Sequence, residues 1–298
     1  MKFFKLVPII SLTTLLLVGC GVGVGQEVNK AQQEDVKNVS VVSATVSATN
    51  VLEKLDAEVI GIPTTKMEIP EKYKELPQVG QAMNPDLEII ASLEPDVLVV
   101  DDTFRKNIEE SLKSYDLNTF YFQSKTYNSF IQSITDLGKE LGKEEEATKL
   151  ITELKKVEEE ARTNKGDKEP TIAIMFGSGE NFMLATESSY LGDLVKTVGG
   201  KNITNELDVK DNGFGYAQFS LEQIMKQNPD YILRFAHGNI EDTKAMFDKA
   251  FDQNPAYKEL DAVKNKKVYD LDSEIFNVSA NLGVTEAIKT LGDMLYGE

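Results

Sequence analysis

The sequence predicts an α/β protein built from two similar lobes that one long helix joins. Residues 87–100 and 221–233 share a pattern in which an amphipathic stretch leads into Pro-Asp and then a short apolar run. Aligned without gaps, the two segments coincide at Leu, Glu, Ile, Pro and Asp. Proline ends a helix because it lacks the N–H and restricts the residue before it, and the apolar run has the length of a buried parallel strand. A repeated helix–strand unit implies two similar α/β lobes.

A long helix is predicted between the two units. Residues 144–163 carry apolar side chains at helical spacing, and Gly166 follows as a cap. At roughly 1.5 Å per residue, this helix spans about 30 Å. An ordinary surface helix would show the same stripe, but the repeat on either side favours a bridge between lobes. Another helix is predicted at 127–141, and the second lobe is expected to open with strands at 171–176 and 181–185, separated by a turn.

The first twenty residues have the form of an export signal. Two lysines precede an apolar stretch that is too short and too early for a membrane span. Its end, Leu17-Val18-Gly19-Cys20, resembles the lipobox of bacterial lipoproteins. That resemblance implies that Cys20 receives a diacylglyceryl group, and that the acyl chains, palmitate among them, anchor the mature chain to the cell membrane. A plain secretory signal with an incidental cysteine is the alternative, although Cys20 is the only cysteine.

Composition excludes several classes of protein. The 298 residues include 32 basic and 49 acidic side chains, for a formal net charge of −17. Such a surface repels nucleic acid and favours solubility. No internal apolar run reaches the roughly eighteen residues of a membrane span. A single cysteine excludes a disulfide framework and a cysteine-based metal or redox site.

Three motifs, in order along the chain, resemble one bacterial family. They are the doubled Glu-x6-Pro-Asp segments, residues 189–202 beginning Ser-Tyr-Leu-Gly-Asp, and residues 254–269. They are similar to the iron-complex binding proteins that serve ABC importers of siderophores, heme and cobalamin. The similarity spans nearly the whole mature chain. It implies two α/β lobes joined by one long helix, a ligand cleft between the lobes and a permease as partner.

A narrower resemblance, to heme-binding lipoproteins of this family, lies in residues 63–85 and 232–238. It implies that a methionine of the first lobe and a histidine of the second bind heme iron from opposite sides, and Met83 and His237 fall on those positions. It also implies surface proteins that donate heme. The predicted function is that of a monomeric extracytoplasmic lipoprotein that receives heme b and delivers it to an ABC permease for iron acquisition.

Considered without the resemblance, these two residues are ambiguous. Met83 precedes Asn84-Pro85, which we expect to be a helix N-cap and first helical residue, and a loop methionine usually fills space. His237 is the only histidine and follows a strand predicted at 231–233. Ligands gather at such carboxyl ends in α/β sheets, although many loop histidines are simply solvated. Together, imidazole nitrogen and thioether sulfur form an established axial pair for heme.

Glu88 and Glu222 occupy matching places in the two repeated units. Each is expected at the start of a helix, where the helix dipole stabilises an acid, and that is a sufficient explanation. In the family, one acid on each lobe docks against arginines of the permease. The resemblance implies this role for Glu88 and Glu222, since charge pairing sets docking register and rate.

Other functions agree less well with the sequence. The leading alternative is a siderophore-binding lipoprotein of the same fold, but anionic siderophores need a cationic pocket and the chain has only Arg105, Arg162 and Arg234 as arginines. A manganese or zinc site would need several histidines. A hydrolase would need a serine in an activating motif, so no catalytic residue is predicted. A purely structural surface protein would not explain the matched units.

The predicted boundaries are a signal peptide at 1–19, a lipid-anchored tether at 20–37, an N-terminal lobe at 38–141, a bridging helix at 142–166 and a C-terminal lobe at 167–298.

Overall fold

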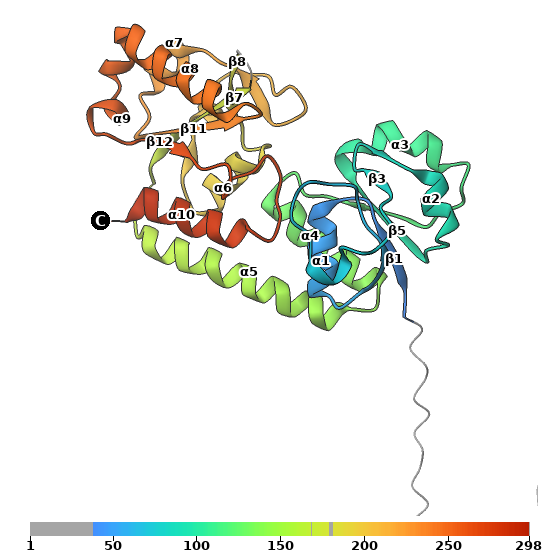
Figure 1. Cartoon of the computed structure of the whole chain (residues 1–298). Coiled ribbons are helices and arrows are strands. Elements are labelled where there is room, and N and C mark those ends of the chain that lie inside the picture. Colours follow the sequence, from blue (N-terminus) through green and yellow to red (C-terminus); the bar gives the residue numbers. More distant parts are fainter. Residues whose placement is uncertain (1–37, 168, 179–180, 298) are drawn as a thin grey trace, which may run out of the picture. The chain divides into compact units, whose positions relative to one another are not determined.

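The predicted α/β class is confirmed by two main sheets flanked by helices (Figure 1). The structure is a computed structural model that describes residues 38–167, 169–178 and 181–297. The predicted signal peptide, Cys20 and the tether lie outside the described residues, as does Gly179 of the expected turn. Within the described ranges, no helix has the length and apolar character needed to cross a bilayer.

The first half of the chain forms a parallel four-stranded sheet in the order β2-β1-β5-β6. Its central strands are buried on both faces, as a parallel sheet covered by helices requires. In β5, Val97 and Val99 enter one apolar core while Leu98 and Val100 enter another, because successive side chains point to opposite faces. The elements of this half are β1 (Ser40–Ser43), α1 (Val46–Lys54), β2 (Glu58–Gly61), η1 (Glu71–Tyr73), β3 (Gly80–Gln81), β4 (Asn84–Pro85), α2 (Leu87–Ser92), β5 (Val97–Asp101), η2 (Asp102–Phe104), α3 (Arg105–Leu112), β6 (Thr119–Phe122) and α4 (Tyr127–Glu140).

The second half forms a mixed sheet in the order β10-β8-β7-β11-β12, with β9 also paired to β7. Strands β7, β11 and β12 run parallel, while β8 and β10 are antiparallel to their neighbours. The expectation that this strand ends at Phe176 is wrong, because β7 continues through Ser178, which pairs with Asn181 and with His237. The elements from α5 onward are α5 (Glu144–Lys165), β7 (Thr171–Ser178), β8 (Asn181–Ala185), α6 (Tyr190–Thr197), β9 (Lys201–Asn202), η3 (Ile203–Glu206), β10 (Tyr216–Gln218), α7 (Leu221–Gln227), β11 (Tyr231–His237), α8 (Ile240–Gln253), η4 (Pro255–Glu259), α9 (Asp261–Lys264), β12 (Val268–Leu271) and α10 (Val284–Tyr296).

The repeated Pro-Asp pair has the same structural task in both halves. The Asp96 carboxylate accepts hydrogen bonds from the backbone N (3.0 Å) and Oγ (2.9 Å) of Ser40, the first residue of β1. The Asp230 carboxylate accepts the equivalent bonds from the N (2.8 Å) and Oγ1 (2.9 Å) of Thr171, the first residue of β7. Each aspartate therefore ties the start of one strand to the start of its parallel neighbour. The internal repeat predicted from the sequence therefore corresponds to the same link between the starts of two parallel strands in each half.

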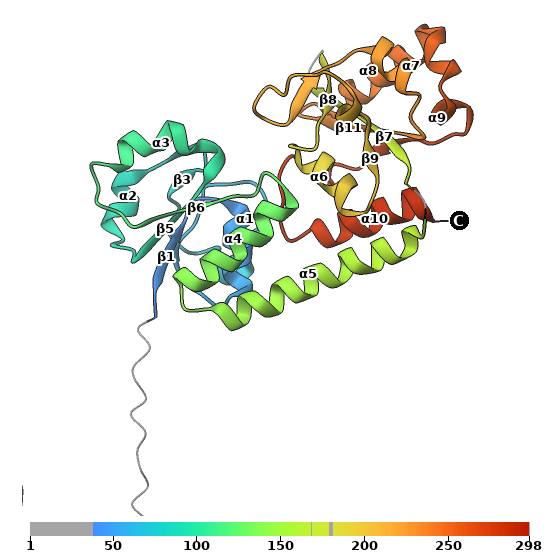
Figure 2. The same ribbon diagram turned by 180° about the vertical axis from the view of Figure 1, so that it is seen from behind.

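Helix α5 contacts helices of both halves (Figures 1 and 2). Near its start it packs on α4, where a Cβ on Gly138 would lie 2.5 Å from the Cβ of Ala147. Near its end it packs on α10, where a Cβ on Gly292 would lie 3.3 Å from the Cβ of Ala161. The helix ends at Lys165 and Gly166 is its C-cap, as the sequence predicts. The lobe boundaries proposed from sequence stay a prediction.

Candidate ligand-binding site

His237 is the last residue of β11, and this strand is longer than the sequence predicts. The interpretation that it ends at Leu233 is wrong, because the arginine that follows is buried and satisfied within the sheet. The Arg234 guanidinium donates from Nε (2.6 Å) and Nη2 (2.6 Å) to Asp270 and from Nη2 to Asp248 (2.9 Å). Burial alone would lower the pKa of Arg234, but these two carboxylates raise it. Arg234 thus stabilises the fold and allows the strand to run on to His237.

The imidazole of His237 lies against a cluster of aromatic rings, here called the aromatic wall, formed by Phe176, Tyr216 and Phe235. The ring centroids of His237 and Phe176 are 5.9 Å apart with an interplanar angle of 29°, and Phe235 lies 6.5 Å away. Phe176 also contacts Tyr216, with ring centroids 4.3 Å apart and planes tilted by 33°. Burial raises the pKa of Tyr216 to about 12. His237 itself is exposed, and its ring nitrogens have no hydrogen-bond partner among the described residues.

Met83 lies in the two-residue turn of a short hairpin. Strands β3 and β4 pair Gly80 with Pro85, and the turn leaves the Met83 side chain 60% exposed. The hairpin needs Gly80, whose φ of +87° places it in the left-handed region and whose Cβ would lie 2.8 Å from the Asp86 N. The expectation that Asn84-Pro85 begins a helix is wrong. Asp86 is the N-cap of α2 instead, and its Oδ1 accepts hydrogen bonds from the backbone N of Glu88 and of Ile89 (both 3.1 Å).

A hollow of about 750 Å³ lies between the two halves, and its volume is within the usual range of small-molecule sites. Neither Met83 nor His237 belongs to its lining, so the hollow is not formed by the two predicted ligands. The first half contributes the segment after β5 and the segment after β6, and the second half contributes one loop. The lining residues are Asp102, Thr103, Phe104, Arg105, Lys106, Asn107, Gln123, Ser124, Lys125, Thr126, Ser129, Asn212, Gly213 and Phe214.

Sequence reasoning missed these lining residues, although one signal was available. Residues 102–107 follow β5 and residues 123–126 follow β6, so both groups lie at the carboxyl ends of parallel strands. Ligands in α/β sheets gather at those ends. The hollow carries three basic side chains, Arg105, Lys106 and Lys125, against one acid, Asp102. Its charge is therefore opposite in sign to that of the whole chain, which suits a ligand with anionic groups.

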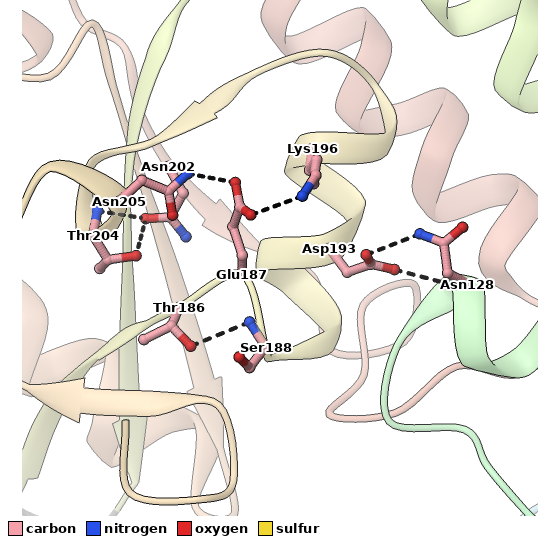
Figure 3. A network of polar contacts seen from close by, with 9 residues as sticks. All are labelled: Asn128, Thr186, Glu187, Ser188, Asp193, Lys196, Asn202, Thr204 and Asn205. Carbon is pink, nitrogen blue, oxygen red and sulfur yellow. Dashed lines mark hydrogen bonds and ion pairs between the residues drawn. The ribbon is translucent and has the colours of Figure 1, made fainter. Parts of the chain in front are cut away.

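A group of polar contacts lies around α6, and one of them reaches the first half of the chain (Figure 3). The buried carboxylate of Asp193 in α6 accepts hydrogen bonds from the N (3.2 Å) and Nδ2 (3.1 Å) of Asn128 at the start of α4. On the other side of α6, Glu187 accepts from Lys196 (2.9 Å) and from Asn205. The Ser-Tyr-Leu-Gly-Asp motif thus ends in a residue that connects the two halves of the chain.

Glu88 and Glu222 lie where the repeat predicts. Each is in the first turn of a short helix, α2 or α7, and each is exposed. Asp86 and Ser220 provide the corresponding N-caps. The two acids therefore have the same local setting, and neither is engaged in an ion pair with another described residue.

Comparison with known proteins identifies the family. The model of the periplasmic binding protein family matches residues 41–275. This chain belongs to the periplasmic binding protein family. The family resemblance predicted from the three motifs is confirmed. As a periplasmic binding protein, the chain has a two-lobed α/β fold and is a substrate-binding protein of an import system, not an enzyme.

Several relatives of this periplasmic binding protein match it over nearly their whole length. The high-affinity heme uptake system protein IsdE of Staphylococcus aureus is 32% identical over 298 residues, which is 99% of each chain. An ABC transporter substrate-binding protein from Listeria monocytogenes has a TM-score of 0.78 at 35% identity and covers 88% of this chain and 100% of its own. The crystal structure of S. aureus IsdE complexed with heme has a TM-score of 0.73 at 33% identity, over 87% of this chain and 99% of its own.

Proposed function

We propose that this periplasmic binding protein carries heme b outside the cell and delivers it to an ABC import permease for iron acquisition. The observation that carries the proposal is the exposed imidazole of His237 at the carboxyl end of β11, with the aromatic wall beside it. Neutral imidazole binds heme iron. The buried rings of Phe176 and Phe235 support the imidazole from within the core. The similarity to IsdE, a heme uptake protein, supports the same ligand.

The alternative is a siderophore-binding protein of the same fold, and the state of the arginines argues against it. Arg105 is paired with Asp102 (2.6 Å) and Arg162 with Glu158 (3.2 Å), and Arg234 is bound within the second sheet. Each arginine is thus already neutralised by an acid of this chain. A polyanionic ferric siderophore would have to rely on the lysines of the hollow.

Titration of the purified protein with hemin tests the proposed ligand. We expect an intense Soret band with low-spin features that saturates at one equivalent, and a higher melting temperature with hemin, because a ligand that binds only the folded state stabilises it. Ferric siderophores of the citrate and hydroxamate classes serve as comparison ligands. A melting temperature raised by a ferric siderophore and unchanged by hemin would replace the heme proposal with the alternative.

The proposal for location is that Cys20 carries the lipid that holds the mature chain at the outer face of the cell membrane, where it acts as a monomer and takes heme from donor proteins of the cell surface. The motif at Leu17-Val18-Gly19-Cys20 supports it. Metabolic labelling with palmitate tests this proposal. A Cys20→Ala variant that is labelled as strongly as the wild type would contradict it.

Docking to the permease is proposed to use Glu88 and Glu222, whose exposure at equivalent helix starts supports the role. The double variant Glu88→Ala/Glu222→Ala is expected to bind hemin as the wild type does but to support heme-dependent growth poorly, because rim charges steer association. The matched control is Glu144→Ala/Glu145→Ala, which removes two exposed acids from the first turn of α5. Equal growth with both double variants would exclude the docking role.

A further inference from the structure

Phe214 is a large apolar side chain that the fold leaves 67% exposed while it lines the hollow. Exposure of one aromatic ring is common, but here specific hydrogen bonds hold the backbone of the surrounding loop. The backbone around the ring is therefore ordered before any ligand arrives.

Two side chains of the loop fold it back on itself. The Asp211 Oδ1 accepts from the N of Gly213 (2.7 Å) and of Gly215 (3.0 Å). The Asn212 Oδ1 accepts from the N of Phe214 (2.9 Å) and of Tyr216 (3.3 Å). Both acceptors thus hold the backbone on either side of Phe214.

Bonds from outside the loop tie it to the rest of the protein. The Thr186 hydroxyl donates to Asp211 Oδ2 (2.6 Å), and the Thr186 N donates to the Gly215 O (2.9 Å). From the first half of the chain, the Lys125 Nζ donates to the Gly213 O (2.9 Å). The backbone that carries Phe214 is consequently bonded to residues of both halves of the chain.

The loop is also continuous with the surface that carries His237. Tyr216, two residues after Phe214, contacts Phe176, and Phe176 stacks on His237. Phe104, Lys106 and Lys125 of the first half line the same hollow. The Ser124 hydroxyl, in a residue only 1% exposed, has no hydrogen-bond partner among the described residues and lies in the same lining. Apolar rings and unneutralised cations side by side suit a flat ligand with an apolar body and anionic edge groups.

We infer that Phe214 is a preformed aromatic platform on which the flat face of the ligand stacks, and that Asp211 is the positioning residue that holds it. The inference rests on the proposed function for the choice of a porphyrin as ligand. It adds a contact that acts on the ring system and is independent of iron ligation. A rigid platform strengthens binding because the loop loses little conformational freedom when the ligand binds.

The test compares hemin with metal-free protoporphyrin, which cannot take axial ligands. Phe214→Ala is expected to weaken binding of both by roughly 10- to 100-fold, the effect of losing one buried aromatic contact. Asp211→Ala is expected to weaken both by about 10-fold because the loop then orders on binding, whereas Asp211→Asn keeps an acceptor and restores most of the affinity. Met67→Ala, which removes a side chain that is 59% exposed and outside the lining, is the control and should bind as the wild type does.

The outcomes separate this inference from the heme proposal. Affinities of Phe214→Ala equal to those of Met67→Ala would overturn the platform and leave the heme proposal standing. A loss for hemin alone would also overturn it, because stacking does not depend on iron. Failure of the wild type to bind either porphyrin would overturn both proposals. Melting temperatures of Phe214→Ala and Met67→Ala should match the wild type, which excludes unfolding as the cause of lost binding.

Discussion

Replacing His237 by alanine is expected to weaken hemin binding by more than about 100-fold, and replacing Met83 by less. Loss of a group that only orients a metal ligand lowers metal affinity by roughly 10- to 100-fold, and loss of the nitrogen ligand itself should lower it further. The thioether of Met83 is a weaker ligand, and it lies in an exposed hairpin turn. Each variant should shift the spectrum toward a high-spin or water-ligated form, measured by absorption during hemin titration.

The same experiment has internal controls. Met67→Ala removes an equally exposed methionine and should keep the wild-type spectrum. The double variant His237→Ala/Met83→Ala should hold hemin loosely, through ring contacts alone and without a defined axial signature. Acid should release heme from the wild type, since a proton competes with iron for the imidazole. Wild-type spectra and affinities in both single variants would place the iron ligands elsewhere.

Gly192→Ala is expected to destabilise the protein by about 3 kcal/mol or more, at the upper end of overpacking effects. The Cβ of an alanine here would lie 1.9 Å from the Thr186 O and 2.9 Å from the Glu187 Cα, and both are backbone atoms that cannot turn aside. Gly192 sits in the first turn of α6, where its N donates to the Ser189 Oγ (3.0 Å). The helix would have to shift away from the segment that precedes it.

The expected shift in α6 also has a consequence for the neighbouring half. Asp193, the next residue, would move relative to Asn128, so the bond between α6 and α4 would weaken. Thermal unfolding should show a fall of roughly 10 °C for a protein of this size. Gly283→Ala is the matched control, because its nearest atom is the flexible Asn281 Oδ1 at 2.9 Å, and it should change stability by less than about 1 kcal/mol. Equal melting temperatures for the two variants would contradict the steric argument.

Local patterns in the sequence predicted several elements closely. The apolar stripe and Gly166 predicted α5 to within two residues of its end, and the gapless match of two Pro-Asp segments predicted equivalent helix–strand units. These features are legible because helical spacing, proline breaks and caps act over a few residues. The hairpin that carries Met83 was missed, because Asn84-Pro85 also has the pattern of a helix start, whereas Gly80 at a φ of +87° pairs with Pro85 and forms a hairpin.

The sequence by itself determined the two-unit α/β plan, the helix between the units and the sign of the overall charge. Only the tertiary structure decided that β11 reaches His237, because Arg234 is tolerated in the sheet by Asp270, 36 residues further along the chain. The tertiary structure alone also brings the Lys125 Nζ to the carbonyl oxygen of Gly213 in the loop of Phe214, 88 residues further along the chain. Such contacts join segments with no common local pattern, so they follow from packing and hydrogen bonding in the assembled fold.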